Sequence, residues 1–381
     1  MTTRQNIENS IRDFSGKNES FYEVKGSKFF SKMQALEEAK GDLNKITFRW
    51  FDSVWDSVDW SQEPKKTFKQ LVKERCLMLR EKHSHISLLY SGGYDSHTIL
   101  TSFLENNIRL DRIIIFTKDY YDNSYDYAYG LQFAQYVKKY YQPWLEIWNP
   151  VLGQKDLPEL YKSLGEEWIY YNNQYKMGKS QSYHLTEKYN KEFAADKIKN
   201  SIWIHGTDKP TLDFRDGKYY ARMHDGKSFD YLYSQKIIPF YYSHDFVDLY
   251  VKQCWLAVNY YEDLNEEITN STIHSTQSHA FSGEYYRKYN LALGRECLNH
   301  PTALYKSYVA DWGGSIENVK ESINLVTYSK KHDEKTYDYF KKGVSIVEEK
   351  ILPLYNCEKI PTILGKSYFI KTAKVKTYDQ N

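Results

Sequence analysis

The stretch that decides the fold is "ISLLYSGGYDSHTIL", residues 86–100. Its first part, ISLLY, is an apolar run with the length of a buried strand, and its last part, DSHTIL, opens a tract suited to a helix. Between them, serine, two glycines, aspartate and a second serine gather at a single turn. The pattern therefore predicts a strand that ends at Ser91 and a helix that begins a few residues later.

Strands and helices alternate on both sides of this stretch. Apolar residues recur at helical spacing over 67–82, which predicts a helix that leads into the first strand. Further buried strands are predicted at RIIIFT (112–117), WLEIWNP (144–150) and SIWIHG (201–206), with a helix over 127–141. Strands separated by helical tracts of this length are typical of a doubly wound, mostly parallel α/β sheet with helices on both faces.

The remaining segments suggest how the chain is divided. Residues 1–70 form an N-terminal extension expected to pack on the core, 71–255 the α/β domain, and 256–381 a mainly helical C-terminal region. Within 46–64 the aromatic-rich sequence is expected to be an irregular packing segment. Two Asp-Gly pairs, at 216–217 and 225–226, flank KYYARM and predict a β-hairpin at the margin of the sheet.

Composition excludes several classes of protein. The 52 basic and 50 acidic residues leave a net charge of +2, so charge gives no indication of a general nucleic-acid binder, although nucleic acid remains possible. The four cysteines are far apart, which argues against a zinc site and favours reduced thiols. No apolar run is long enough for a membrane span, so a cytoplasmic protein is expected.

The 37 tyrosines raise one open question. Several lie beside lysine, as in "VKKYYQPW" at 137–144, where rings and cations together can stack and hold nucleic-acid bases. Amphipathic packing near the surface, with the hydroxyl in water, explains the same pattern. The second interpretation is favoured because the tyrosines are spread over the whole chain.

The SGGYDS turn has the chemistry of a phosphate site. A loop at a helix N-terminus presents unpaired N–H groups, and the helix dipole adds to their attraction for anions. Gly92 and Gly93 leave no Cβ in the way of a phosphate, while Ser91 and Ser96 supply hydroxyl donors. Asp95 fits such a site if it binds a Mg²⁺ ion carried by the phosphate, or if it caps the helix. A plain helix-capping turn is the alternative.

The SGGYDS motif resembles the PP-loop of the N-type ATP pyrophosphatases, whose relatives include the synthetase domain of asparagine synthetase. The resemblance implies an adenine nucleotide alpha hydrolase-like fold, ATP and Mg²⁺ as cofactors, and an ATP-dependent, AMP-forming ligase. Its nucleotide-binding residues would be Ser91, Gly92, Gly93, Tyr94, Asp95 and Ser96, with Tyr94 at the variable position. His97, where that branch commonly has a small residue, is expected either at a phosphate or on the helix surface.

Other blocks match the family less closely. Thr117, at a strand end, is expected near adenine, although it is equally an ordinary strand end. "HGTDKP" at 205–210 resembles a second family signature, which implies nucleotide contacts from Gly206 and Asp208, a metal-ligand role for Asp208 beside Asp95, and charge stabilisation by Lys209. A turn at Asp-Lys-Pro is the alternative. Arg295 and Lys306 are expected to reach phosphate, or else to lie on a solvated helix face.

The expected reaction follows from this resemblance. An acceptor carboxylate or carbonyl attacks the α-phosphorus of ATP, pyrophosphate leaves, and an amine or ammonia then displaces AMP. Asp95, Lys209, Arg295 and Lys306 are the expected catalytic residues. Thr2 stands where asparagine synthetase has its nucleophilic cysteine, and the N-terminal extension of about 70 residues is too short for a glutaminase domain, so a separate glutaminase is a candidate partner.

Two alternatives stay open at this point. A sulfonucleotide (PAPS) reductase-like protein uses a similar loop with a reactive cysteine, for which Cys357 is the candidate here. A nucleotide-binding scaffold that has lost catalysis would also keep the loop. The acceptor, whether a small molecule or a modified base, and the oligomeric state cannot be read from the sequence.

Overall fold

The computed structural model describes residues 19–90, 94–115, 117–118, 125–149, 151–152, 165–171, 198–206, 210–225, 237–263, 269, 334–357 and 360–374. Its main sheet is parallel, has five strands and follows the order β12-β9-β4-β5-β7. These strands are β4 (His85–Leu89), β5 (Arg112–Ile114), β7 (Glu146–Trp148), β9 (Ser201–His205) and β12 (Ile237–Pro239). Along the chain, β6 (Thr117–Lys118) follows β5 and β8 (Val151–Leu152) follows β7, and the two form a separate short parallel pair.

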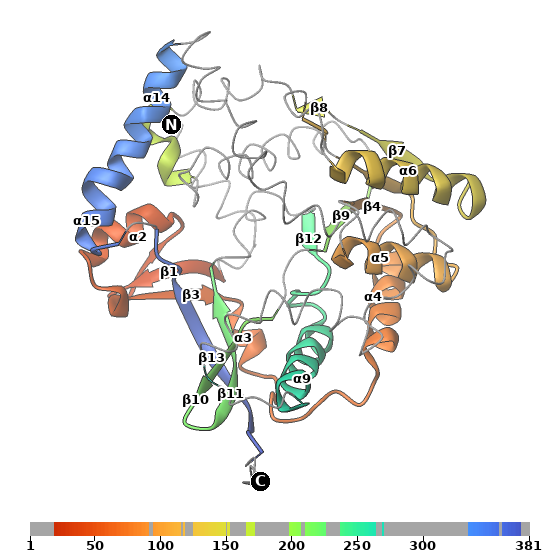
Figure 1. The fold of residues 1–381 in the computed structure, drawn as a ribbon, viewed down its shortest axis with the longest axis horizontal. Coiled ribbons are helices and arrows are strands. Elements are labelled where there is room, and N and C mark those ends of the chain that lie inside the picture. The colour runs from red at the N-terminus through yellow and green to blue at the C-terminus, as the bar shows by residue number, and fades with distance from the viewer. Residues whose placement is uncertain are drawn as a thin grey trace, which may run out of the picture.

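Helices flank this sheet, as Figure 1 shows. They are α4 (Phe68–Lys82), α5 (Tyr94–Glu105), α6 (Tyr125–Tyr140) and α9 (Val247–Asp263). The predicted strand–helix alternation and the doubly wound α/β class are therefore confirmed. α4 starts at a capping box, in which Thr67 and Gln70 exchange side-chain and backbone hydrogen bonds. Its buried residues then recur along one face that packs against α5 and α9.

The central strands β4 and β9 of the main sheet are buried because both faces are covered. All five residues of β9 are buried, as are His85 to Leu88 of β4. Parallel strands inside α/β proteins have this nearly continuous apolar character because helices exclude water from both sides. β4, the strand of the opening motif, lies at the centre of the sheet, paired with β5 and β9.

Two small antiparallel sheets form the opposite side of the molecule (Figure 1). One has the order β2-β1-β3, and the other the order β10-β11-β13. Their strands are β1 (Ser20–Val24), β2 (Ser27–Phe29), β3 (Ile46–Trp50), β10 (Leu212–Arg215), β11 (Lys218–His224) and β13 (Leu364–Thr372). Shorter elements nearby are α2 (Lys32–Ala39), α3 (Asp52–Trp55), α14 (Glu334–Ser345), α15 (Leu352–Leu354), η1 (Leu43–Lys45), η2 (Gly165–Tyr171) and η4 (Ile346–Ile351).

The predicted hairpin is confirmed, and the structure refines its place. Asp216 and Gly217 have φ values of 50° and 69°, as a two-residue turn between β10 and β11 requires. β11 then pairs with β13 from the end of the chain, so the hairpin belongs to a separate sheet. β13 was not predicted, and residues 46–50, expected to be irregular, form β3.

Buried polar and aromatic groups join the small sheets. The Asp225 carboxylate accepts a hydrogen bond from Tyr22 Oη at 2.9 Å and forms an ion pair with Lys32 Nζ at 2.7 Å. Trp55 and Trp50 stack on Tyr242, which lies just before α9, with ring centroids 5.6 and 5.7 Å apart. The aromatic segment near residue 50 therefore packs between the small sheets and the helix that follows the main sheet.

Within the described ranges, no helix has both the length and the apolar character needed to cross a lipid bilayer. The predicted domain boundaries, the compartment and the oligomeric state stay predictions. Cys76 and Cys254 are buried, and Cys357 is half-buried. Cys297 lies outside the described residues.

Candidate functional site

The opening motif lies at the topological switch point of the main sheet. After β4 the chain continues to the neighbour on one side, β5, whereas after β9 it continues to β12 on the other side. The loops that follow the adjacent strands β4 and β9 therefore leave the sheet in opposite directions. In open α/β sheets, the crevice between two such loops is where ligands bind.

Gly206 is in direct contact with the first turn of α5. A Cβ built on Gly206 would lie 2.8 Å from the Ser96 backbone nitrogen and 2.9 Å from the Asp95 carbonyl carbon. Real Cβ atoms do not approach backbone this closely, so glycine is required here for steric reasons. The two sequence blocks predicted to bind nucleotide, SGGYDS and HGTDKP, thus meet at this contact.

The first turn of α5 carries the described part of the motif. Tyr94 is the first residue of the helix and Asp95 lies in its first turn. Ser96 is buried, whereas Asp95 is only half-buried. Acidic side chains are stabilised at a helix N-terminus by the free N–H groups and the dipole. Ser91, Gly92 and Gly93 lie outside the described residues.

Tyr241, which the sequence did not single out, holds this first turn in place. Its hydroxyl donates a hydrogen bond to the Asp95 carbonyl oxygen at 2.9 Å. Burial raises the pKa of Tyr241 well above its ordinary value, and the nearby Asp95 charge adds to the shift. The phenol therefore stays protonated and remains a donor throughout the physiological range.

The segment that carries Tyr241 is anchored from α4. The guanidinium of Arg75, fully buried, contacts Asp245 Oδ1 at 2.7 Å and donates to Ser243 Oγ at 3.0 Å. Burial tends to raise the pKa of Asp245, but the Arg75 charge and the Ser243 hydrogen bond outweigh it, and the net shift is downward. On the other side, Phe240 N donates to His205 O at 2.9 Å, which ties the segment to β9.

A second hydrogen bond links the two ends of the loop. Tyr90, the last residue before the loop, has its hydroxyl 2.9 Å from His97 Nδ1 in the first turns of α5. The His97 ring also packs against Phe133 of α6, with centroids 4.7 Å apart. His97, expected at a phosphate or on the helix surface, is buried with 5% of its surface exposed. A surface position is therefore wrong, because the ring fills the space between α5 and α6.

His205, next to Gly206, is a buried neutral histidine. Burial lowers its pKa from 6.5 to about 3. In the unfolded chain the imidazole takes up a proton below pH 6.5, whereas in the folded chain it does so only near pH 3. The free energy of unfolding is therefore largest above pH 6.5 and falls as the pH drops from 6.5 towards 3.

This linkage gives the first prediction. Between about pH 6 and 4.5, the free energy of unfolding should fall with a contribution from His205 of up to about 1.4 kcal/mol per pH unit. Urea unfolding of the native protein and of His205→Gln at several pH values measures it. The variant should lose most of this dependence of stability on pH. A smaller part should remain from His83, whose pKa is also lowered by burial. Equal slopes in the two proteins would contradict the assignment.

Of the remaining predicted site residues, the structure describes only Thr117. Thr117 lies in β6, where its backbone pairs with Val151 of β8, just beyond the end of β5. Asp208 and Lys209 lie outside the described residues. The nearest described residues on either side, Gly206 and Pro210, are buried. Arg295 and Lys306 also lie outside them.

No cluster of three or more His, Cys, Asp or Glu side chains suited to a metal ion occurs among the described residues. Mg²⁺ bound with nucleotide needs fewer protein ligands, because phosphate oxygens and water fill most of its coordination positions. The carboxylate of the half-buried Asp95, at the first turn of α5, fits that kind of site.

No protein-family model and no curated protein matches the chain. Among solved structures, the chain is similar to an NH3-dependent NAD synthetase from Campylobacter jejuni subsp. jejuni NCTC 11168, solved in complex with the nitrate ion. The identity is 13%, the match covers 75% of this chain and 96% of that chain, and the TM-score is 0.32. Because a likeness of that size carries no argument, the fold assignment rests on the strand order and register of the main sheet.

Proposed function

We propose that the protein is an ATP-dependent, AMP-forming ligase of the ATP pyrophosphatase type. It would adenylate a carboxylate or carbonyl oxygen of an acceptor, release pyrophosphate, and then form a C–N bond with an amine or ammonia. The observation that carries this proposal is the contact of Gly206 with Asp95 and Ser96, since it joins the two predicted nucleotide blocks at the switch point of the sheet.

The proposed roles of individual residues are those that the sequence motifs imply. The N–H groups at the start of α5, with Ser91, Gly92, Gly93 and Ser96, would bind the β- and γ-phosphates. Asp95, together with Asp208, would hold the Mg²⁺ that accompanies them, and this ion would neutralise phosphate charge. Thr117 would contact adenine. Lys209, with Arg295 and Lys306, would stabilise the charge on departing pyrophosphate.

Positioning and charge stabilisation would supply most of the rate enhancement. The acceptor oxygen must lie in line with the α-phosphorus while the pyrophosphate is held in place. The buried contacts around α5, from Tyr241, Tyr90 and His97, favour a rigid first turn and hence a fixed phosphate site. The nitrogen would come from free ammonia, from a separate glutaminase or from another amine.

The direct test is product analysis. The protein is incubated with Mg²⁺ and ATP labelled at the α- or γ-phosphate, with pooled carboxylic acids, amino acids or tRNA, and with ammonium. Labelled AMP and pyrophosphate are the expected products. Formation of ADP and phosphate would contradict the proposal. Sulfite formed from PAPS in the presence of a thiol would instead support the reductase alternative, with Cys357 as its candidate nucleophile.

The hydroxyl of Tyr241 gives the second prediction. Tyr241→Phe keeps the ring and removes the hydroxyl that donates to the Asp95 carbonyl. A net hydrogen bond is worth about 1 kcal/mol, so ATP affinity should fall about 3- to 10-fold. Calorimetric titration with a non-cleavable ATP analogue measures this change. Tyr242→Phe is the matched control, because that neighbouring hydroxyl contacts the Met223 sulfur. Equal losses in both variants would refute a specific role for Tyr241.

A further inference from the structure

A cluster of exposed rings lies at the end of α6. Tyr140, Tyr141 and Trp144 have 59%, 41% and 49% of their surfaces exposed. Tyr136 supports the two tyrosines from within the helix, with its ring centroid 4.8 Å from Tyr140 and 5.9 Å from Tyr141. Among the described residues, the other large aromatic side chain exposed to this extent is Phe369 of β13. Such a concentration of exposed rings marks an interaction surface.

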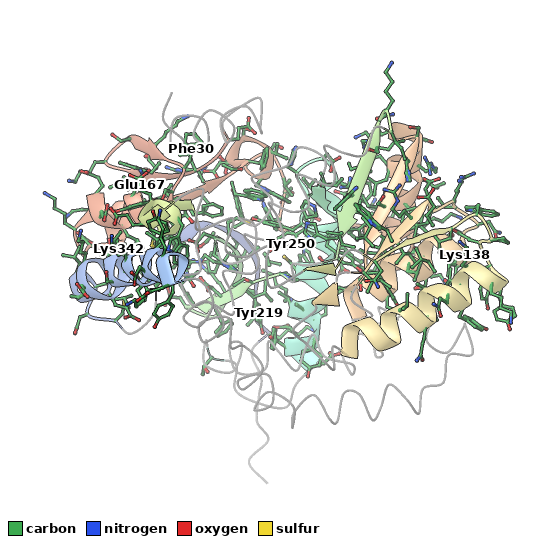
Figure 2. All side chains as sticks on the ribbon, turned by 90° about the horizontal axis from the view of Figure 1, so that it is seen from above. Phe30, Lys138, Glu167, Tyr219, Tyr250 and Lys342 are labelled. Atoms are coloured by element: carbon green, nitrogen blue, oxygen red, sulfur yellow. The ribbon has the colours of Figure 1, made fainter. Side chains whose placement is uncertain are left out.

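Cations accompany these rings. Lys139 Nζ lies 4.9 Å from the centre of the Tyr140 ring, and the Arg109 guanidinium lies 5.7 Å from that of Trp144. Lys138 is exposed on the last turn of α6, at the opposite end of the molecule from Lys342 of α14 in Figure 2. The three rings, Arg109, Lys138 and Lys139 together form what we call the aromatic–basic patch.

The net charge of the patch is positive. The carboxylate paired with Arg109, that of Asp111, is shared between Arg109 at 2.7 Å and Arg80 at 2.5 Å, so these three side chains carry one net positive charge. Glu146 pairs with Arg112 at 2.9 Å. Lys138 and Lys139 then add two further charges, because neither forms an ion pair within the part of the chain that the structure describes.

The patch lies away from the candidate nucleotide site. Arg109 precedes β5, and residues 141–145 precede β7, so both lie at the amino ends of parallel strands. The loops after β4 and β9 lie at the carboxyl ends. The patch is therefore at the opposite edge of the main sheet and is separate from the residues assigned to ATP.

We propose that the aromatic–basic patch binds single-stranded nucleic acid. Bases stack on exposed Tyr and Trp rings, and phosphates pair with the lysines and Arg109 around them, which is how proteins bind single strands without sequence preference. Protein–protein interfaces are enriched in aromatic residues but depleted in lysine, so a second protein fits the charges less well. The proposal is independent of the proposed function.

Fluorescence anisotropy with labelled oligouridylate and oligothymidylate of about 12 nucleotides tests the proposal, without ATP. The native protein should bind both with a Kd in the micromolar range at moderate salt. Tyr140→Ala and Trp144→Ala should each weaken binding about tenfold, whereas Tyr140→Phe, which keeps the ring, should not. Lys138→Gln with Lys139→Gln should also reduce the salt slope by about 0.7 for each phosphate that is no longer neutralised.

Matched controls lie elsewhere on the surface. Phe369→Ala removes an exposed ring, and Lys341→Gln with Lys342→Gln neutralises two adjacent exposed lysines of α14; neither should change binding. No binding, or binding equal in the patch and control variants, would overturn the proposal. Self-association by sedimentation that the patch variants abolish, without nucleic-acid binding, would assign the patch to a protein interface. ATP turnover is measured in the same patch variants, so that a failure of the nucleic-acid proposal can be told apart from a failure of the proposed function.

Discussion

Replacing Asp95 by alanine is expected to reduce pyrophosphate release at least about a hundredfold while leaving the protein folded. Asp95 is the carboxylate that the structure places at the first turn of α5, half-buried and at the switch point. In the proposed site, the Mg²⁺ that would neutralise the phosphates would lose a ligand in this variant, and charge stabilisation of this kind is worth two to three orders of magnitude in rate. Release of labelled pyrophosphate measures the loss.

Ser91→Ala, at the start of the same loop, should have an effect in the same direction. Asp248→Ala is the matched control, because Asp248 also lies in the first turn of a helix, α9, and is exposed. Thermal unfolding should show that all three variants remain folded. Unchanged turnover in Asp95→Ala would count heavily against the assigned role of the loop.

Replacing Gly206 by alanine is expected to lower ATP turnover about a hundredfold and to destabilise the fold by about 1–3 kcal/mol. The added methyl group would overlap the backbone of Asp95 and Ser96, which are main-chain atoms with no rotamer to change. The first turn of α5 must therefore shift, and displacements of about 1 Å at a reacting site can cost two orders of magnitude. Steady-state turnover and urea unfolding measure the two effects.

Gly343→Ala is the control that separates loss of stability from loss of ATP turnover. A Cβ on this α14 glycine would overlap the Trp168 side chain, which is buried and donates a hydrogen bond to Tyr339 O at 3.1 Å. This variant should lose stability without losing turnover at a temperature where it is folded. If Gly206→Ala loses only stability, as Gly343→Ala should, the contact with α5 has no role in phosphate binding.

The elements of the main sheet could be predicted because each has its own periodicity. The buried strands are continuous apolar runs, and α4, α5, α6 and α9 repeat their apolar residues at helical spacing. The Asp216–Gly217 turn was equally predictable, since both residues accept positive φ. The local sequence pattern was therefore sufficient to predict those elements whose geometry depends on neighbouring residues.

Pairing between distant segments could not be predicted in the same way. β13 and β11 lie far apart in the chain, and β13 has mostly half-buried side chains, so its sequence lacks a strong alternation. The contact of Gly206 with α5 depends on β9 pairing with β4, which no local pattern specifies. Tyr241 carried no local signal, because its hydroxyl reaches Asp95 only through the place of β12 in the sheet.

The most direct measurement is a crystal structure of the protein with Mg²⁺ and α,β-methylene-ATP, which cannot be cleaved between the α- and β-phosphates. The predicted result is a triphosphate seated on the first turn of α5, with phosphate oxygens within hydrogen-bond distance of the N–H groups near residues 92–96. Gly206 should lie alongside it. A nucleotide bound elsewhere, or a loop after β4 that hydrogen-bonds to itself and excludes phosphate, would contradict the account.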